Sequence, residues 1–139
     1  MNVLRAARTG STRQLTHGHA APRRLKHYLN ADRATFDKLT SAAHTADRVV
    51  LVDFYAEWCN PCKILSPILE KLAADESTKS GTGRAVDLVT IDTDAEVGLA
   101  AQFDVRSIPT VYAFKDGKPV EHFVGAMNEA GVRRFLEHL

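Results

Sequence analysis

Residues 49–63 read VVLVDFYAEWCNPCK, an apolar run that leads directly into a pair of cysteines. The run from 49 to 55 is typical of a buried β-strand, and the apolar spacing after Cys62 predicts a helix. The cysteines therefore lie where a strand passes into a helix N-terminus, a position that favours a thiolate. Cys59 and Cys62 are the only cysteines in the chain. Two thiols at this spacing can form a small disulfide and open it again, so the stretch predicts a redox site.

The composition limits what the rest of the chain can be. Its 139 residues are enough for one domain with a hydrophobic core and too few for two. Hydrophobic residues make up 45% and charged residues 25%, as in a soluble globular protein, and no apolar run approaches the ~20 residues that span a membrane. All 17 acidic side chains lie within residues 32–139, together with only 12 of the 18 basic ones. This part of the chain is therefore net acidic, which argues against a nucleic-acid partner. No histidine has metal-ligand spacing to the cysteines, so no metal centre is expected.

Residues 1–24 have the composition of a targeting segment. They contain five arginines and no acidic residue, and on a helix their apolar side chains would share one arc while the arginines occupy the next. This pattern is typical of a mitochondrial transit peptide. It predicts a mature domain over residues 25–139 and a location in the mitochondrial matrix. A chloroplast address, or a basic tail on a cytoplasmic protein, is the alternative.

Periodicity and chain-breaking residues predict one α/β domain. The predicted strands are 25–29, 49–55, 86–91, 110–114 and 120–124, and the predicted helices are 32–43, 61–74, 95–103 and 128–139. This order, βαβαβαββα, indicates a mixed sheet, parallel where helices connect its strands and antiparallel at the last hairpin. Residues 77–83 are expected to form a surface loop.

The apolar spacing also predicts which helix faces are buried. The first helix, capped by Asn30 or Asp32, should bury Phe36, Leu39 and Ala43. The second should be interrupted and kinked at Pro67, because a proline inside a helix removes a backbone donor. Its expected core residues are Ile64, Leu65, Ile68, Leu69 and Leu72.

Four segments in order resemble those of the thioredoxin family. Residues 52–63 resemble its active-site stretch, and Ser107-Ile108-Pro109-Thr110 resembles its cis-proline loop. Residues 114–117 and 124–126 resemble its hairpin and the glycine beside the active site. The resemblance covers residues 25–139 and implies a thioredoxin fold, a central mixed β-sheet flanked by helices.

Three positions depart from the family pattern. Asn60 replaces the usual glycine between the first cysteine and the proline, and Tyr55 replaces an aromatic that is usually tryptophan. Leu88 aligns with a lysine that in many members lies near the buried aspartate. These departures remove no reacting group, but Asn60 and Leu88 are expected to shift the redox potential or the reaction rate.

The position of the two thiols predicts different roles for them. Cys59, before the first helical turn, faces unpaired N–H groups that should lower its pKa and make it the attacking thiol. Cys62, one turn inside the helix, should be more shielded and should resolve the mixed disulfide. Pro61 suits the first helical turn and stiffens the loop.

Asp53 is a carboxylate in an otherwise apolar strand. Burial would raise its pKa and suit it to accept the proton of Cys62, a role to which the resemblance also points. The absence of a lysine at Leu88 should keep Asp53 protonated to higher pH than in typical members. The alternative is an edge-strand aspartate that faces water.

Partner proteins are expected to bind around the thiols. Trp58 offers a flat apolar surface, or else packs on the domain, and a cis Ile108–Pro109 bond would present a backbone edge to an extended peptide. The resemblance implies a docking surface formed by Trp58, Asn60, Pro61, Ile108, Pro109, Gly125 and Ala126.

The resemblance implies a thiol–disulfide oxidoreductase that reduces protein disulfides and is recycled by an NADPH-linked thioredoxin reductase. It would use no cofactor beyond its own disulfide, bind no metal, nucleic acid or membrane, and act as a monomer. One alternative is an oxidising or isomerising domain, which Asn60 would favour if it makes the disulfide easier to reduce. Another is a binding or chaperone module that does not use the thiols.

Overall fold

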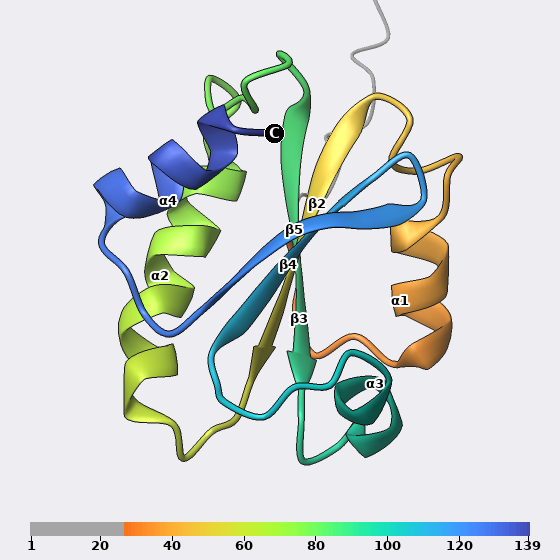
Figure 1. The fold of residues 1–139 in the computed structure, drawn as a ribbon, viewed down its shortest axis with the longest axis vertical. Coiled ribbons are helices and arrows are strands. Elements are labelled where there is room, and N and C mark those ends of the chain that lie inside the picture. The colour runs from red at the N-terminus through yellow and green to blue at the C-terminus, as the bar shows by residue number, and fades with distance from the viewer. Residues whose placement is uncertain (1–26) are drawn as a thin grey trace, which may run out of the picture.

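The computed structural model describes residues 27–139, which form one sheet with helices on both of its faces (Figure 1). The strands are β1 (His27–Tyr28), β2 (Arg48–Tyr55), β3 (Ala85–Asp92), β4 (Thr110–Lys115) and β5 (Lys118–Val124). The helices are α1 (Arg33–Thr40), α2 (Asn60–Ala74), α3 (Val97–Gln102) and α4 (Glu129–Glu137). The predicted order βαβαβαββα and the mixed sheet are confirmed.

The sheet has the strand order β1-β3-β2-β4-β5. Strand β3 pairs in parallel with β1 and β2, whereas β4 is antiparallel to β2 and β5. Helices α2 and α4 lie on one side of the sheet and α1 and α3 on the other (Figure 1). The central strand β2 is therefore covered on both faces, which explains its continuous apolar run.

Alternate residues of β2 belong to two separate cores. Val49 and Leu51 pack with the apolar residues of α2 and α4. Val50, Val52 and Phe54 pack with those of α1 and with a cluster of aromatic rings. Because side chains alternate along a strand, one eight-residue segment anchors both layers and holds its carboxyl end in a defined place.

The second helix differs from the prediction in two respects. It runs through Pro67 without interruption, and Ile64 is 65% exposed instead of facing the core. The buried residues of α2 are Cys62, Leu65, Leu69, Leu72 and Ala73. At about 100° per residue, Ile64 lies about 160° from Cys62 around the helix, so a buried face that includes Cys62 leaves Ile64 exposed.

The first helix is shorter than predicted. Asp32 is its N-cap, with the Thr35 N–H donating to the carboxylate at 2.8 Å, and Phe36 and Leu39 are buried as expected. The chain turns to an extended conformation at Ser41, so Ala43 lies outside the helix and is exposed. The prediction for Ala43 was wrong because helical spacing no longer applies there.

The loop at 77–83 is attached to the last helix. The Gly81 N–H donates to the Leu136 carbonyl at 2.9 Å, and the Thr82 hydroxyl donates to the Leu139 carbonyl at 2.8 Å. A Cβ at Gly81 would overlap the Glu137 carbonyl oxygen. Parts of the loop are buried, which the polar sequence did not indicate.

The predicted transit peptide lies outside the described residues. Of the expected strand 25–29, the structure describes a short pairing of His27 and Tyr28 with β3. Within residues 27–139, no helix is both long and apolar enough to cross a membrane.

Candidate active site

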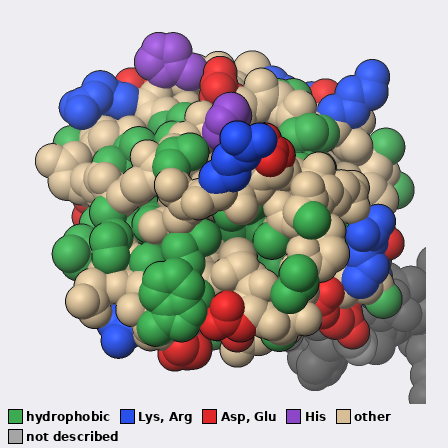
Figure 2. Space-filling model, turned by 60° about the horizontal axis from the view of Figure 1, so that its bottom comes forward, with side chains coloured by type: hydrophobic (Ala, Val, Ile, Leu, Met, Phe, Trp, Pro, Cys, Tyr) green, Lys and Arg blue, Asp and Glu red, His purple; other side chains and the backbone are tan. Residues whose placement is uncertain are grey.

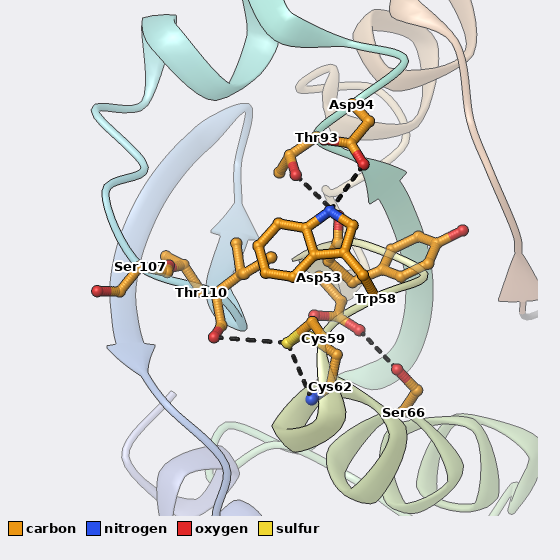
Figure 3. Close-up of a disulfide and its surroundings, with 11 residues drawn as sticks. Asp53, Trp58, Cys59, Cys62, Ser66, Thr93, Asp94, Ser107 and Thr110 are labelled. Atoms are coloured by element: carbon orange, nitrogen blue, oxygen red, sulfur yellow. Dashed lines mark hydrogen bonds between the residues drawn. A yellow bond between two sulfur atoms is a disulfide. The ribbon is translucent and has the colours of Figure 1, made fainter.

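The two cysteines form a disulfide at the point where β2 passes into α2 (Figure 3). Their Cα atoms are 5.3 Å apart. Cys59 is the N-cap residue of α2, and the Cys62 N–H donates to its sulfur at 3.2 Å. Pro61 lies in the first turn, where a missing N–H costs nothing. A thiolate at Cys59 would accept this N–H bond and face the positive end of the helix dipole, so the predicted position is confirmed.

Both cysteines are shielded from solvent. Cys59 is 3% and Cys62 1% exposed, so the expected difference in shielding is small. Their surroundings differ more. The Cys59 sulfur lies 3.7 Å from the Ile108 carbonyl oxygen, whereas Cys62 lines an open pocket of about 240 Å³ together with Ser66 and Glu70.

The predicted docking residues Ile108, Pro109 and Gly125 come together beside Cys59. The Ile108–Pro109 peptide bond is cis, and Ile108 packs against the cysteine pair. The Gly125 N–H donates to the Pro109 carbonyl at 2.8 Å, which joins the end of β5 to the proline loop. Gly125 has a φ of +88°, a conformation that side chains disfavour, and Ala126 after it is exposed.

Trp58 is 68% exposed, so it does not pack into the domain. Its indole N–H donates to the Asp94 carboxylate at 2.9 Å, a contact that was not predicted (Figure 3). Asn60 and Pro61 are also exposed, on the first turn of α2. Figure 2 shows this end of the molecule as an apolar surface with acidic side chains at its edge. Such a surface suits the docking of another protein.

Asp53 is fully buried on the central strand, so the edge-strand alternative is wrong. One carboxylate oxygen accepts a hydrogen bond of 3.3 Å from the Ser66 hydroxyl (Figure 3). The other has no hydrogen-bond partner among the described residues. Burial raises the pKa of Asp53 to about 7, the Ser66 hydrogen bond opposes this rise, and the negative charge of Glu70 adds to it. Asp53 can therefore exchange a proton near neutral pH.

The strand register gives the neighbours of Asp53 on the two adjacent strands. Leu88 lies opposite Leu51, and the β3 residue opposite Asp53 is Thr90. On the other side, Asp53 lies opposite Val111 of β4. Thr90 accepts a hydrogen bond of 2.8 Å from the Asn30 N–H. The residues opposite Asp53 on both adjacent strands are therefore uncharged, and so is Leu88, two residues before Thr90 on the same face of β3.

Tyr55 ends β2 with its hydroxyl at the surface. That hydroxyl contacts the side-chain oxygen of Asn30 and donates to Glu57 at 3.5 Å. Burial, then the charges of Asp92 and Glu57, raise the pKa of Tyr55. Sequence reasoning identified neither the Tyr55–Asn30 contact nor the role of Ser66, because each joins two different elements of the chain.

Among residues 27–139, no three histidine, cysteine or acidic side chains lie together in a way that could hold a metal ion. The chemistry that the arrangement can perform is thiol–disulfide exchange, in which the two sulfur atoms themselves carry the electrons. A reversible dithiol at a helix N-terminus, with a buried carboxyl and an apolar docking surface, defines a dithiol–disulfide oxidoreductase.

Comparisons with known proteins give the family. The thioredoxin family model matches residues 27–138. The chain is 41% identical to thioredoxin of Mycolicibacterium smegmatis over 102 residues, 73% of this chain and 88% of that protein. It is 43% identical to thioredoxin of Staphylococcus aureus over 89 residues, 64% of this chain and 80% of that protein. The crystal structure of Fasciola hepatica thioredoxin superposes with a TM-score of 0.66 at 32% identity, covering 80% of this chain and 97% of the other.

The chain belongs to the thioredoxin family. Thioredoxins are protein-disulfide reductases, and this chain has the dithiol on which that activity depends. It is therefore a thiol–disulfide oxidoreductase that works through its redox-active disulfide without a cofactor.

Proposed function

We propose that Cys59 attacks the disulfide of a partner protein and that Cys62 resolves the mixed disulfide. The observation that carries this order is the Cys62 N–H on the Cys59 sulfur at the start of α2. The first attack joins Cys59 to one substrate sulfur and releases the other as a thiolate. Cys62 then gives its proton to Asp53 and attacks Cys59, releasing the second substrate thiolate. Two electrons pass to the substrate, and the Cys59–Cys62 disulfide forms.

Insulin reduction with matched serine variants tests this order. Cys62→Ser should accumulate a mixed disulfide through Cys59, visible as a mass increase that a reductant removes. Cys59→Ser should form no such adduct, although it keeps the other thiol. Equal trapping by both variants would overturn the assignment of the attacking sulfur.

The partner binds on the surface formed by Trp58, Asn60, Pro61, Ile108, Pro109, Gly125 and Ala126. The exposure of Trp58 and the closeness of the Ile108 carbonyl to the Cys59 sulfur support this proposal. An extended peptide that paired with this carbonyl would bring its own disulfide to Cys59. Disulfide-containing proteins are the substrates, and an NADPH-linked thioredoxin reductase returns the dithiol to its reduced state. NADPH oxidation in a coupled assay with such a reductase tests the second partner.

An oxidising or isomerising domain is the competing function, which Asn60 between the two thiols would favour if it makes the disulfide easier to reduce. A redox titration separates the two. A reductase should have a potential near the roughly −270 mV of thioredoxins, whereas about −180 mV would place the chain with disulfide isomerases.

We also propose that residues 1–24 are a transit peptide and that the domain acts as a monomer in the mitochondrial matrix. The arginine-rich, acid-free composition supports the address. N-terminal sequencing of the protein recovered from mitochondria should find a start between about residues 20 and 30. An intact N-terminus on protein recovered from the cytoplasm would contradict it. Light scattering of the 15.3 kDa chain tests the monomer.

A further inference from the structure

Ser66 contributes the one hydrogen bond that residues 27–139 give the Asp53 carboxyl. It lies four residues after Cys62 on α2, so both side chains are on the same face of the helix. Its hydroxyl donates to one Asp53 oxygen at 3.3 Å, while the other oxygen has no partner among the described residues. The orientation of a fully buried carboxyl therefore depends on a side chain from another element.

Ser66 also reaches the solvent. It lines the open pocket of about 240 Å³ beside Cys62 and a second open pocket of about 230 Å³ beside Thr90. Both pockets are lined by Tyr55, Glu57, Ser66 and Glu70. Ser66 therefore stands between the buried carboxyl and space that is large enough for water.

We propose that Ser66 is a positioning residue of the dithiol reaction, which orients the Asp53 carboxylate and passes its proton to water in these pockets. This inference rests on the proposed role of Asp53 as the acceptor of the Cys62 proton. After Cys62 attacks Cys59, Asp53 carries that proton. Asp53 returns to the carboxylate by giving the proton to the Ser66 oxygen, while the Ser66 hydroxyl gives its own proton to water. Ser66 is unchanged, and the substrate thiolates take protons from solvent.

Glu70 provides an opposing charge on the same helix face. It lies four residues after Ser66 and lines both pockets. The Ser66 hydrogen bond favours the ionised form of Asp53, whereas the charge of Glu70 disfavours it. The other titratable groups that line the pocket beside Cys62 are Lys63 and Glu70 on α2, Tyr55 at the end of β2 and Glu57 after it. The strand neighbours of Asp53, Thr90 on β3 and Val111 on β4, are uncharged. Removing Ser66 or Glu70 should therefore shift the titration of Asp53 in opposite directions.

The test measures the rate of disulfide reduction by the full chain between pH 5.5 and 9. Ser66→Ala should move the acidic limb of the profile up by roughly one pH unit, the size expected for one hydrogen bond to a carboxylate. Starting from a pKa of about 7, that shift lowers the ionised fraction of Asp53 at pH 7 about fivefold, and the rate with it. Ser66→Thr, which keeps the hydroxyl, should restore the limb. Glu70→Gln should move it down.

A carbon NMR titration of the Asp53 carboxyl in the oxidised protein gives a readout apart from activity, and it should follow the same order. Limbs of Ser66→Ala and wild type that coincide would overturn the inference. So would shifts of Ser66→Ala and Glu70→Gln in the same direction, which indicate general destabilisation. Asp53→Asn separates this from failure of the proposed function, because an unchanged limb in that variant would show that Asp53 itself takes no part.

Discussion

Replacing Asp53 with asparagine should remove a loss of stability that the oxidised wild type undergoes as the pH rises from about 4 to 8. In the folded protein, burial raises the pKa of Asp53 to about 7 from an unfolded value of 3.8. Between these values the folded state holds a proton that the unfolded state has lost. The contribution of Asp53 to stability is therefore complete below about pH 4 and is lost as the pH rises through 7.

The magnitude follows from the separation of the two pKa values. A difference of about three pH units, at about 1.4 kcal/mol per unit, costs the wild type about 4 kcal/mol above pH 7 relative to pH 4. Asparagine does not titrate and can still accept the Ser66 hydrogen bond. The difference in unfolding free energy between Asp53→Asn and wild type should therefore grow by about this amount from pH 4 to pH 8.

Urea denaturation of the oxidised proteins at several pH values measures this difference. Asp37→Asn is a matched control, because that carboxylate is 56% exposed in an i,i+4 pair with Arg33. Its difference from wild type should stay within about 0.5 kcal/mol at every pH. If the Asp53→Asn difference is equally flat from pH 4 to pH 8, Asp53 does not titrate in this range and the argument from burial is refuted.

Two further predictions concern the loop at 77–83 and the docking surface. Gly81→Ala should destabilise the protein by about 1–3 kcal/mol in thermal unfolding, because the added Cβ would overlap the Glu137 carbonyl. Gly98→Ala is the control, because its Cβ would enter open space and should not destabilise the protein. Equal losses of stability in the two variants would contradict the contact at Gly81. Trp58→Ala should lower kcat/KM for insulin about tenfold, the scale of an interface anchor, while the melting temperature stays within a few degrees. An unchanged kcat/KM would remove Trp58 from the docking surface.

Local signals predicted the central part of the structure correctly. The apolar run of β2, the proline after Cys59 and the spacing of Leu65, Leu69 and Leu72 each act within a few residues of one another. Local interactions of this kind determine where a strand ends and a helix begins, so the site of the dithiol could be predicted. The burial of Asp53 followed from its apolar neighbours on the same strand.

Features that depend on long-range contacts were predicted poorly. Thr90 lies opposite Asp53 through the register of β3, and no local signal in the sequence gives that register. Asp94 holds Trp58 from another loop, and Ser66 reaches Asp53 from another element. Asp87 is also a buried strand carboxylate, paired with Arg48 at the start of β2 and with His44 before that strand, and nothing in its own neighbourhood distinguished it. Such pairings exist only once the layers are packed.

The position of Trp58 also gives the molecule an optical reporter. It is the only tryptophan in the chain, it adjoins Cys59, and its indole is tied to Asp94 at the protein surface. All tryptophan emission therefore originates beside the disulfide, and disulfides quench the excited state of a neighbouring indole. Fluorescence of the unlabelled protein should follow electron transfer in real time. A bound partner that lacks tryptophan would add no tryptophan emission to this signal.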